Sequence, residues 1–222
     1  MPRCAKTASR CWRKCARCAT ASPTSRASPP VDSEGEGEGE GVAKLIILDR
    51  DGVINRERGH ICAPEDWQPL PGSLEAIARL CRHDYKIAVL TNQSAVGRGL
   101  LTVDALNKIH LRMHHLARRK GGDIEAVLFC PHPPGHGCAC RKPRPGMFHE
   151  LAARLQTSLA GVPAVGDSLR DLQAAAAAGA SPVLALSGNA AVSDIKADKT
   201  LGAVPAHADL AAFTDHLLGG TG

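Results

Sequence analysis

Five short apolar segments, separated by stretches with helical spacing, constrain the fold of this chain more than any other feature. They are strand-length runs at Lys44–Leu48, Lys86–Leu90, Ile124–Phe129, Val162–Val165 and Pro182–Leu186. Because these runs are apolar on both faces, the strands must be covered on both sides. Strands that alternate with helices typically form a parallel sheet. The sequence therefore predicts a three-layer, Rossmann-like α/β fold with a mostly parallel sheet.

The stretches between the strands carry apolar residues at the spacing of an α-helix. Helices are predicted at Ser73–His83, from Thr102 onwards, and at Pro145–Gln156, Leu169–Ala178 and Ala208–Leu218, with a further short strand near Ala203–Pro205. Thr102 is suited to cap the long helix. The apolar face of that helix is predicted to comprise Val103, Leu106, Ile109, Met113 and Leu116. The same helix carries histidines that lack the acidic partner of a metal-binding HExxH motif and are predicted to face solvent, namely His110, His114 and His115.

The first 42 residues differ from the rest in composition. From Met1 to Pro30 there are seven basic residues and no acidic one, and Ser33–Gly41 repeats Glu and Gly. Such a segment cannot bury enough apolar surface to fold. Residues 1–42 are interpreted as a disordered low-complexity tail or a translation start set too early, and residues 43–222 as one folded domain. An organelle transit peptide fits less well because prolines interrupt any amphipathic helix, and Cys11, Cys15 and Cys18 offer only three close ligands to a metal.

Polar clusters follow four of the predicted strands, at the point where each strand ends. They are Asp49-Arg50-Asp51, Thr91-Asn92-Gln93, the Cys/His loop running into Arg141-Lys142, and Gly166-Asp167. The carboxyl ends of parallel strands meet at one edge of a sheet, which is where ligands bind in such folds. We therefore expect these clusters to converge on a single site.

The residue types at that edge favour phosphoryl transfer. This reaction needs a nucleophile, a proton donor for the leaving oxygen, and positive charge on the phosphoryl group. Asp49 is predicted to be the nucleophile, and Asp51 the acid that protonates the leaving oxygen and then activates water. Asp167 adds a hard oxygen ligand for Mg²⁺, and Lys142 neutralises phosphate charge. Further hydrogen bonds to phosphate are predicted from Thr91 and Asn92.

Asp171, four residues after Asp167, has two possible roles. It can support the metal ligands from behind, or it can be an acidic residue in the first turn of a helix, favoured by the helix dipole. The sequence leaves both roles open.

A second metal site is predicted in the loop after the third strand. Cys130, His132, Cys138 and Cys140 supply three thiolates and an imidazole, which suit a closed, structural zinc site. His136 is a weaker candidate ligand than His132. Because the loop leads directly into Arg141-Lys142, zinc would fix the direction of the catalytic lysine.

The four ordered clusters resemble the motifs of the haloacid dehalogenase superfamily of phosphatases. The resemblance rests on Asp49-Arg50-Asp51-Gly52-Val53, Thr91, Lys142 and Gly166-Asp167. It implies hydrolysis through an aspartyl-phosphate intermediate. It also implies that Mg²⁺ is held by the carboxylates of Asp49 and Asp167 and by the main-chain carbonyl of Asp51.

The zinc loop narrows the resemblance. The sequences CPH at 130–132, CxCRKPxPGM at 138–147 and TNQSxxxRG at 91–99 are similar to the D-glycero-D-manno-heptose 1,7-bisphosphate 7-phosphatase family. These enzymes have no large cap domain and act in the pathway to ADP-heptose for the lipopolysaccharide core. By position, the resemblance implies substrate contacts at Glu57, Arg58, Gly59, His60, Thr91, Asn92, Gln93, Ser94, Arg98, Arg141 and Lys142. Ser168 stands where some members have a lysine, which leaves one substrate contact and the anomer preference open.

Two alternatives are weighed against this function. A histidinol-phosphate phosphatase would use the same chemistry with a related zinc loop. A zinc-stabilised nucleic-acid-binding protein, or an inactive binding protein of the same fold, would need no turnover. The chain lacks an aromatic surface for stacking bases. We therefore predict a cytoplasmic, monomeric enzyme with Mg²⁺ and Zn²⁺ as cofactors and a phosphorylated sugar as substrate, and with no nucleic-acid or membrane partner.

Overall fold

The computed structural model describes residues 44–57, 59, 61–188, 192–201 and 203–219. The interpretation of residues 1–42 as a tail therefore falls outside the described residues. The same holds for the substrate contacts expected at Arg58 and His60. No helix in the described part of the chain is both long enough and apolar enough to cross a membrane.

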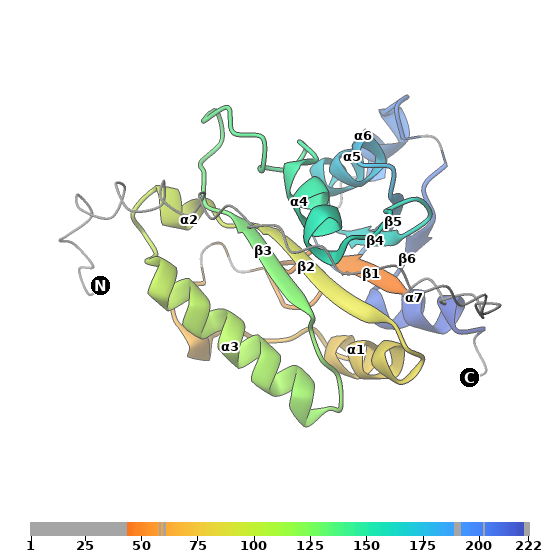
Figure 1. The fold of residues 1–222 in the computed structure, drawn as a ribbon, viewed down its shortest axis with the longest axis horizontal. Coiled ribbons are helices and arrows are strands. Elements are labelled where there is room, and N and C mark those ends of the chain that lie inside the picture. The colour runs from red at the N-terminus through yellow and green to blue at the C-terminus, as the bar shows by residue number, and fades with distance from the viewer. Residues whose placement is uncertain (1–43, 58, 60, 189–191, 202, 220–222) are drawn as a thin grey trace, which may run out of the picture. The chain divides into compact units, whose positions relative to one another are not determined.

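A six-stranded sheet forms the centre of the domain, with strand order β3-β2-β1-β4-β5-β6 (Figure 1). The strands are β1 (Leu45–Leu48), β2 (Lys86–Asn92), β3 (Ala126–Cys130), β4 (Pro163–Gly166), β5 (Ser181–Ala185) and β6 (Ala206–His207). Each pair of neighbouring strands is parallel. The predicted parallel sheet is confirmed, and β1 occupies its middle, between β2 and β4.

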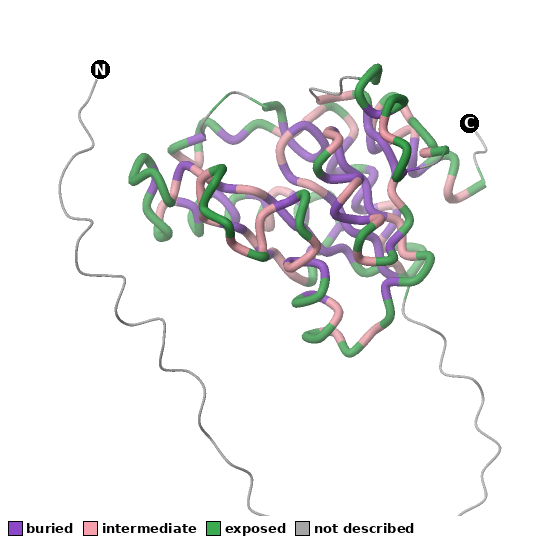
Figure 2. Tube along the Cα trace, turned by 90° about the horizontal axis from the view of Figure 1, so that it is seen from above, coloured by how far each residue is buried: buried purple, intermediate pink, exposed green. Residues whose placement is uncertain are grey.

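Helices cover both faces of this sheet. They are α1 (Ser73–Arg82), α2 (Ser94–Gly97), α3 (Val103–Arg119), α4 (Gly146–Leu155), α5 (Leu169–Ala177), α6 (Val192–Ala197) and α7 (Leu210–Leu217), with a 3-10 turn at Pro64–Asp66. Alternate residues of β1 enter different cores, as the two-residue period of a strand requires. Ile46 and Leu48 pack in the cluster with α1, α3 and α7, whereas Leu45 and Ile47 pack in the cluster with α4 and α5. The fold is thus the expected three-layer one, and Figure 2 shows its buried residues gathered in the interior.

Three details differ from the sequence-based expectation. The last strand lies at Ala206–His207 rather than near Ala203–Pro205. Val103 is 45% exposed at the first residue of α3, and His110 is buried rather than solvated. His110 lies four residues after Leu106 and three before Met113, so it shares the buried stripe of the helix. A pattern based on apolar residue types alone passes over a histidine at such a position.

Candidate active site

A polar cavity of about 190 Å³ lies at the carboxyl ends of the central strands. Its lining includes most of the predicted site residues, namely Asp49, Asp51, Glu57, Gly59, Thr91, Asn92, Gln93, Ser94, Arg141, Lys142 and Asp167. Arg98 is exposed at the end of α2 and is not among the described residues that line this cavity. The expected convergence of four distant clusters is therefore present in the structure.

Three carboxylates form the floor of the cavity. Asp49, Asp167 and Asp171 each place an oxygen within 4.8 Å of the others. Asp49 follows β1, Asp167 follows β4, and Asp171 lies in the first turn of α5. Oxygen donors of this kind are those that Mg²⁺ prefers, so the donor set fits the predicted ion.

Lys142 lies against this acidic group and is almost completely buried. Its Nζ is 2.8 Å from Asp49 Oδ1 and 2.7 Å from Asp171 Oδ1, and it donates to the Leu90 carbonyl at 2.7 Å. Burial would lower the pKa of Lys142, but the charges of Asp171 and Asp49 outweigh it, so the pKa is raised. The lysine is therefore a permanent positive charge beside the expected nucleophile, Asp49.

One lysine does not neutralise this group of acids. Burial raises the pKa of Asp49 to about 7, even though the charge of Lys142 opposes the rise and those of Asp171, Asp51 and Asp167 add to it. Full ionisation of Asp49 at neutral pH needs further positive charge nearby. A divalent cation would supply that charge, which agrees with the chemistry of the donor set.

Asp171 combines the two roles that the sequence left open. Its carboxylate pairs with Lys142 and also closes a capping box with Ser168 at the start of α5. Ser168 donates to Asp171 from both its main-chain nitrogen and its hydroxyl. Ser168 thus orients an acid of the site.

Two glycines make room for the Asp167 carboxylate. A Cβ at Gly52 would come within 2.2 Å of Asp167 Oδ2, and one at Gly188 within 2.0 Å. Gly52 also has φ +82°, in the left-handed region that favours glycine. The sequence indicated the turn at Gly52 but gave no sign of the role of Gly188, because that residue follows the fifth strand and belongs to none of the motifs.

Asp51 is held away from the acidic group by donors on three residues. Arg50 contacts both of its oxygens, with Nη2 3.0 Å from Oδ1 and 2.8 Å from Oδ2, and Asn55 Nδ2 is 2.9 Å from Oδ1. Gln93 Nε2 is 2.8 Å from Asp51 Oδ2 and 2.9 Å from the buried hydroxyl of Thr91. Burial would raise the pKa of Asp51, but Arg50 and these hydrogen bonds lower it. Gln93 therefore links the expected acid–base residue to an expected phosphate ligand.

Asn92 makes contacts that the sequence did not indicate. Its Nδ2 donates to the carbonyl of Lys142 at 3.2 Å, and its Oδ1 accepts from the Lys142 main-chain nitrogen at 3.2 Å. The amide of Asn92 thus anchors the backbone that carries the buried lysine. Its expected role as a phosphate ligand stays a prediction.

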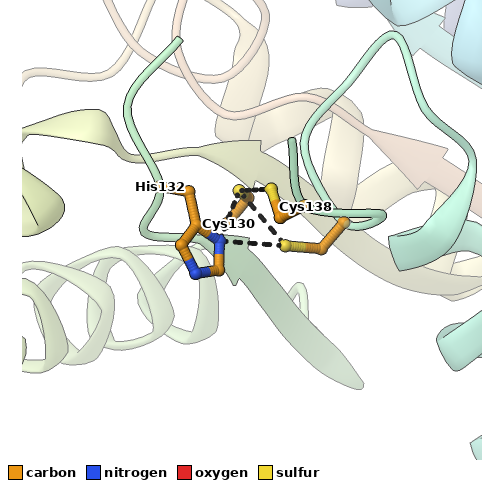
Figure 3. A group of neighbouring side chains, drawn as sticks. Cys130, His132 and Cys138 are labelled. Atoms are coloured by element: carbon orange, nitrogen blue, oxygen red, sulfur yellow. Dashed lines mark hydrogen bonds between the residues drawn. The ribbon is translucent and has the colours of Figure 1, made fainter. Parts of the chain in front are cut away.

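The predicted zinc ligands also come together. Cys130, His132, Cys138 and Cys140 each offer an atom within 4.8 Å of the others, and Figure 3 shows the labelled side chains pointing toward one another. Contacts among Cys130, Cys138, Cys140 and His132 Nδ1 span 3.3–3.7 Å. Ligands bonded to a tetrahedral zinc ion at about 2.0–2.3 Å lie about 3.3–3.8 Å apart. The group thus has the dimensions of a zinc site, and the ring of His136 stacks on His132, 4.2 Å between centroids.

Sequence reasoning missed three basic residues at the site. Arg50 is 1% exposed behind Asp51, and His110 lies 3.3 Å from its Nη1. Arg170, in the first turn of α5, is exposed and lines the cavity. Arg170 follows Asp167 by three residues, which is about one turn of a helix. A basic residue one turn after the fourth polar cluster was therefore the signal that could have identified it.

Comparison with known proteins agrees with this geometry. A family model for haloacid dehalogenase-like hydrolases matches residues 30–179. The chain is 54% identical over 147 residues to the D-glycero-beta-D-manno-heptose-1,7-bisphosphate 7-phosphatase of Bordetella bronchiseptica, covering 66% of this chain and 82% of that protein. It is 47% identical over 146 residues to the enzyme of the same name from Neisseria meningitidis, covering 65% of this chain and 78% of that protein.

A solved structure is similar over most of the domain. The crystal structure of the D,D-heptose 1,7-bisphosphate phosphatase from B. bronchiseptica, complexed with magnesium and phosphate, matches with a TM-score of 0.75 and 48% identity. The match covers 79% of this chain and 98% of that one. The corresponding crystal structure from Burkholderia thailandensis matches with a TM-score of 0.62 and 42% identity, with the same coverage.

Proposed function

Because the chain belongs to the haloacid dehalogenase-like hydrolases, and among them to the D-glycero-beta-D-manno-heptose-1,7-bisphosphate 7-phosphatase family, we propose that it removes the 7-phosphate of that heptose bisphosphate. The observation that carries the proposal is the placement of Asp49, Asp167 and Lys142 around one polar cavity. The product would feed ADP-heptose synthesis for the lipopolysaccharide core, in the cytoplasm.

The reaction would proceed in two steps on the carboxylates of the chain. An oxygen of Asp49 attacks phosphorus, and the bond from phosphorus to the sugar oxygen breaks. Asp51 gives that oxygen a proton, which it must take up before this step because its pKa in the site is lowered. Asp51, now a carboxylate, takes a proton from water, and the resulting hydroxide attacks the phosphorus of the aspartyl phosphate. Inorganic phosphate leaves, and both aspartates return to their starting states.

Charge compensation for these steps comes from Lys142 and from the metal. Held by the carboxylates of Asp49 and Asp167 and the main-chain carbonyl of Asp51, Mg²⁺ would neutralise the phosphoryl oxygens. Lys142, buried between Asp49 and Asp171, supplies the fixed positive charge of the chain itself. The hydroxyl of Thr91, which accepts from Gln93 Nε2 at 2.9 Å, would donate to the phosphoryl group.

Zinc bound by Cys130, His132, Cys138 and Cys140 would have a structural role. It closes the loop whose next two residues are Arg141 and Lys142, and Arg141 Nη1 is already tied to the His132 carbonyl at 3.0 Å. This arrangement orients both basic side chains relative to the cavity.

The second phosphate of the substrate needs its own positive charge. Arg141 and Arg170 line the same cavity from two different elements. We assign them to the phosphate that is not hydrolysed, because a guanidinium pairs well with phosphate oxygens.

Phosphate release from two substrates, measured side by side with Mg²⁺ present, tests the proposal. The expected result is much faster release from D-glycero-D-manno-heptose 1,7-bisphosphate than from histidinol phosphate, with the 1-phosphate retained in the product by ³¹P NMR. Preference for histidinol phosphate would assign the chain to the alternative enzyme.

A further inference from the structure

A buried arginine lies directly behind the expected acid–base residue. Arg50 is 1% exposed, although arginine is almost never so buried unless paired. Burying an isolated charge is costly, so such a side chain remains only where partners hold it. Its partners are Asp51, with which it forms an ion pair at 2.8 Å, and His110 of α3.

The contacts of Arg50 fix the plane of the Asp51 carboxylate. Nη2 contacts both oxygens, at 3.0 and 2.8 Å, and Nε lies 3.2 Å from Oδ1. A guanidinium is a planar fork, so it sets orientation as well as charge. A lysine at this position could supply the charge but would not fix the plane of the Asp51 carboxylate.

His110 holds Arg50 from the other side. Arg50 Nη1 is 3.3 Å from His110 Nε2, and a guanidinium has no acceptor, so the histidine must accept there as a neutral ring. Burial and the charge of Arg50 lower the pKa of His110 to about 3, consistent with a neutral ring. The ring also lies against Phe129 of β3, 6.0 Å between centroids. The position of Asp51 is thus linked to α3, an element that contributes none of the described residues that line the cavity.

We propose that Arg50 and His110 are positioning residues that together hold the Asp51 carboxylate in line with the leaving-group oxygen. This inference rests on the proposed phosphatase function and goes beyond it, because neither residue needs to touch substrate. A proton donor is useful only within hydrogen-bond reach of the oxygen that it protonates. Loss of the positioning pair should therefore act most on the step in which that oxygen leaves.

The test uses leaving groups that need a proton and leaving groups that do not. An alkyl phosphate such as the heptose bisphosphate releases an alkoxide, and this leaving group requires the acid. 4-Nitrophenyl phosphate releases a stable phenolate, which does not. For Arg50→Met and Arg50→Lys, kcat/KM for the alkyl ester should fall about 10²-fold. With 4-nitrophenyl phosphate the loss should stay within about threefold, because general acid catalysis contributes little there.

His110 provides a second pair of variants that preserves the DRDG motif. His110→Phe removes the acceptor and should lower kcat/KM for the alkyl ester about tenfold, whereas His110→Gln keeps an acceptor and should recover most of that loss. His115→Phe, at an exposed position of the same helix, is the matched control and should leave both rates unchanged. Circular dichroism on every variant checks that the fold is intact, and the His110 pair keeps the test decisive if Arg50→Met does not fold.

The outcomes separate this inference from the function on which it rests. An active wild-type protein whose variants lose equal activity on both leaving groups, or none, overturns the positioning role alone. Full activity of Arg50→Lys on the alkyl ester shows that charge rather than orientation matters, and also overturns it. A wild-type protein that does not hydrolyse the heptose bisphosphate overturns the proposed function, and this inference with it.

Discussion

Lys142 places its Nζ 2.8 Å from Asp49 Oδ1, although the two residues are 93 positions apart in the chain. The same nitrogen lies 2.7 Å from Asp171 Oδ1, so a single buried cation joins the loop after the zinc ligands to the carboxyl end of β1 and the first turn of α5. Electrostatic balance in the active site depends on this lysine, and two of the predictions below follow from it.

Removing the nucleophile should abolish turnover and leave the fold intact. Asp49→Asn is nearly isosteric, and we expect phosphate release to fall by about 10⁴-fold or more, as for other covalent nucleophiles. Asp104→Asn, at an exposed position of α3, is the matched control. Trapping of a phosphorylated protein followed by peptide mapping would locate the modified residue. A rate that persists in Asp49→Asn contradicts the assignment.

Removing the charge of Lys142 should destabilise the domain and should also slow catalysis. Lys142→Met leaves Asp49 and Asp171 buried without their cation, and loss of one partner of a buried ion pair costs about 3–5 kcal/mol of unfolding free energy. We expect Mg²⁺ to restore part of this loss, because the ion binds the same acids. Thermal unfolding with and without Mg²⁺ measures both effects. Lys108→Met, an exposed substitution on α3, should change neither quantity.

Loss of a zinc ligand should slow catalysis because the zinc loop would no longer orient the side chain of Lys142. Cys140→Ser is expected to reduce kcat about 10- to 100-fold and to lower bound zinc, which is measured by elemental analysis. Cys62→Ser changes an exposed thiol outside the cluster and serves as control. If a zinc-free protein keeps its full rate, the loop has no part in orienting the lysine.

Truncating Arg170 should weaken the binding of a bisphosphate selectively. Arg170→Ala removes one positive charge from the cavity without touching Asp49 or Lys142. We expect KM for the heptose bisphosphate to rise about tenfold, in line with the loss of a charged hydrogen bond of about 1.5 kcal/mol or more, with kcat little changed. A monophosphate ester should show no such rise. Equal effects on the two substrates would mean that Arg170 does not bind the second phosphate.

Stability should decrease in mild acid because His110 is buried as a neutral ring. Its pKa in the folded protein is lowered to about 3, whereas in the unfolded chain it is near 6.5. Between these values only the unfolded state gains the proton, so stability is lost as pH falls below about 6.5. By pH 4.5 this amounts to about 2–3 kcal/mol. Chemical denaturation of His110→Asn across this range should show a shallower acid loss than the wild-type protein.

The sequence predicted the fold and the convergence of the polar clusters well because both depend on local patterns. Runs that are apolar on both faces specify buried parallel strands, and the polar residues after them necessarily meet at one edge. His110 and Gly188 were missed because their roles depend on partners far away in sequence, and the role of Arg50 depends on His110 as well as on its neighbour Asp51. His110 was predicted to be solvated from its residue type, yet the helical register places it beside Met113, and only the packed structure brings it to Arg50.

The position of β1 in the middle of the sheet has a consequence for how the enzyme comes into being. Its neighbour β2 follows closely in sequence, but β4, which carries Asp167 to the cavity, is made much later. At about 5–20 residues per second, residue 167 leaves the ribosome roughly 6–24 s after residue 49. Throughout that interval the growing polypeptide carries Asp49 without Asp167, the second carboxylate expected to bind the divalent ion. Magnesium would therefore stabilise the completed sheet rather than start its assembly. Catalysis begins only after the second half of the domain has been translated.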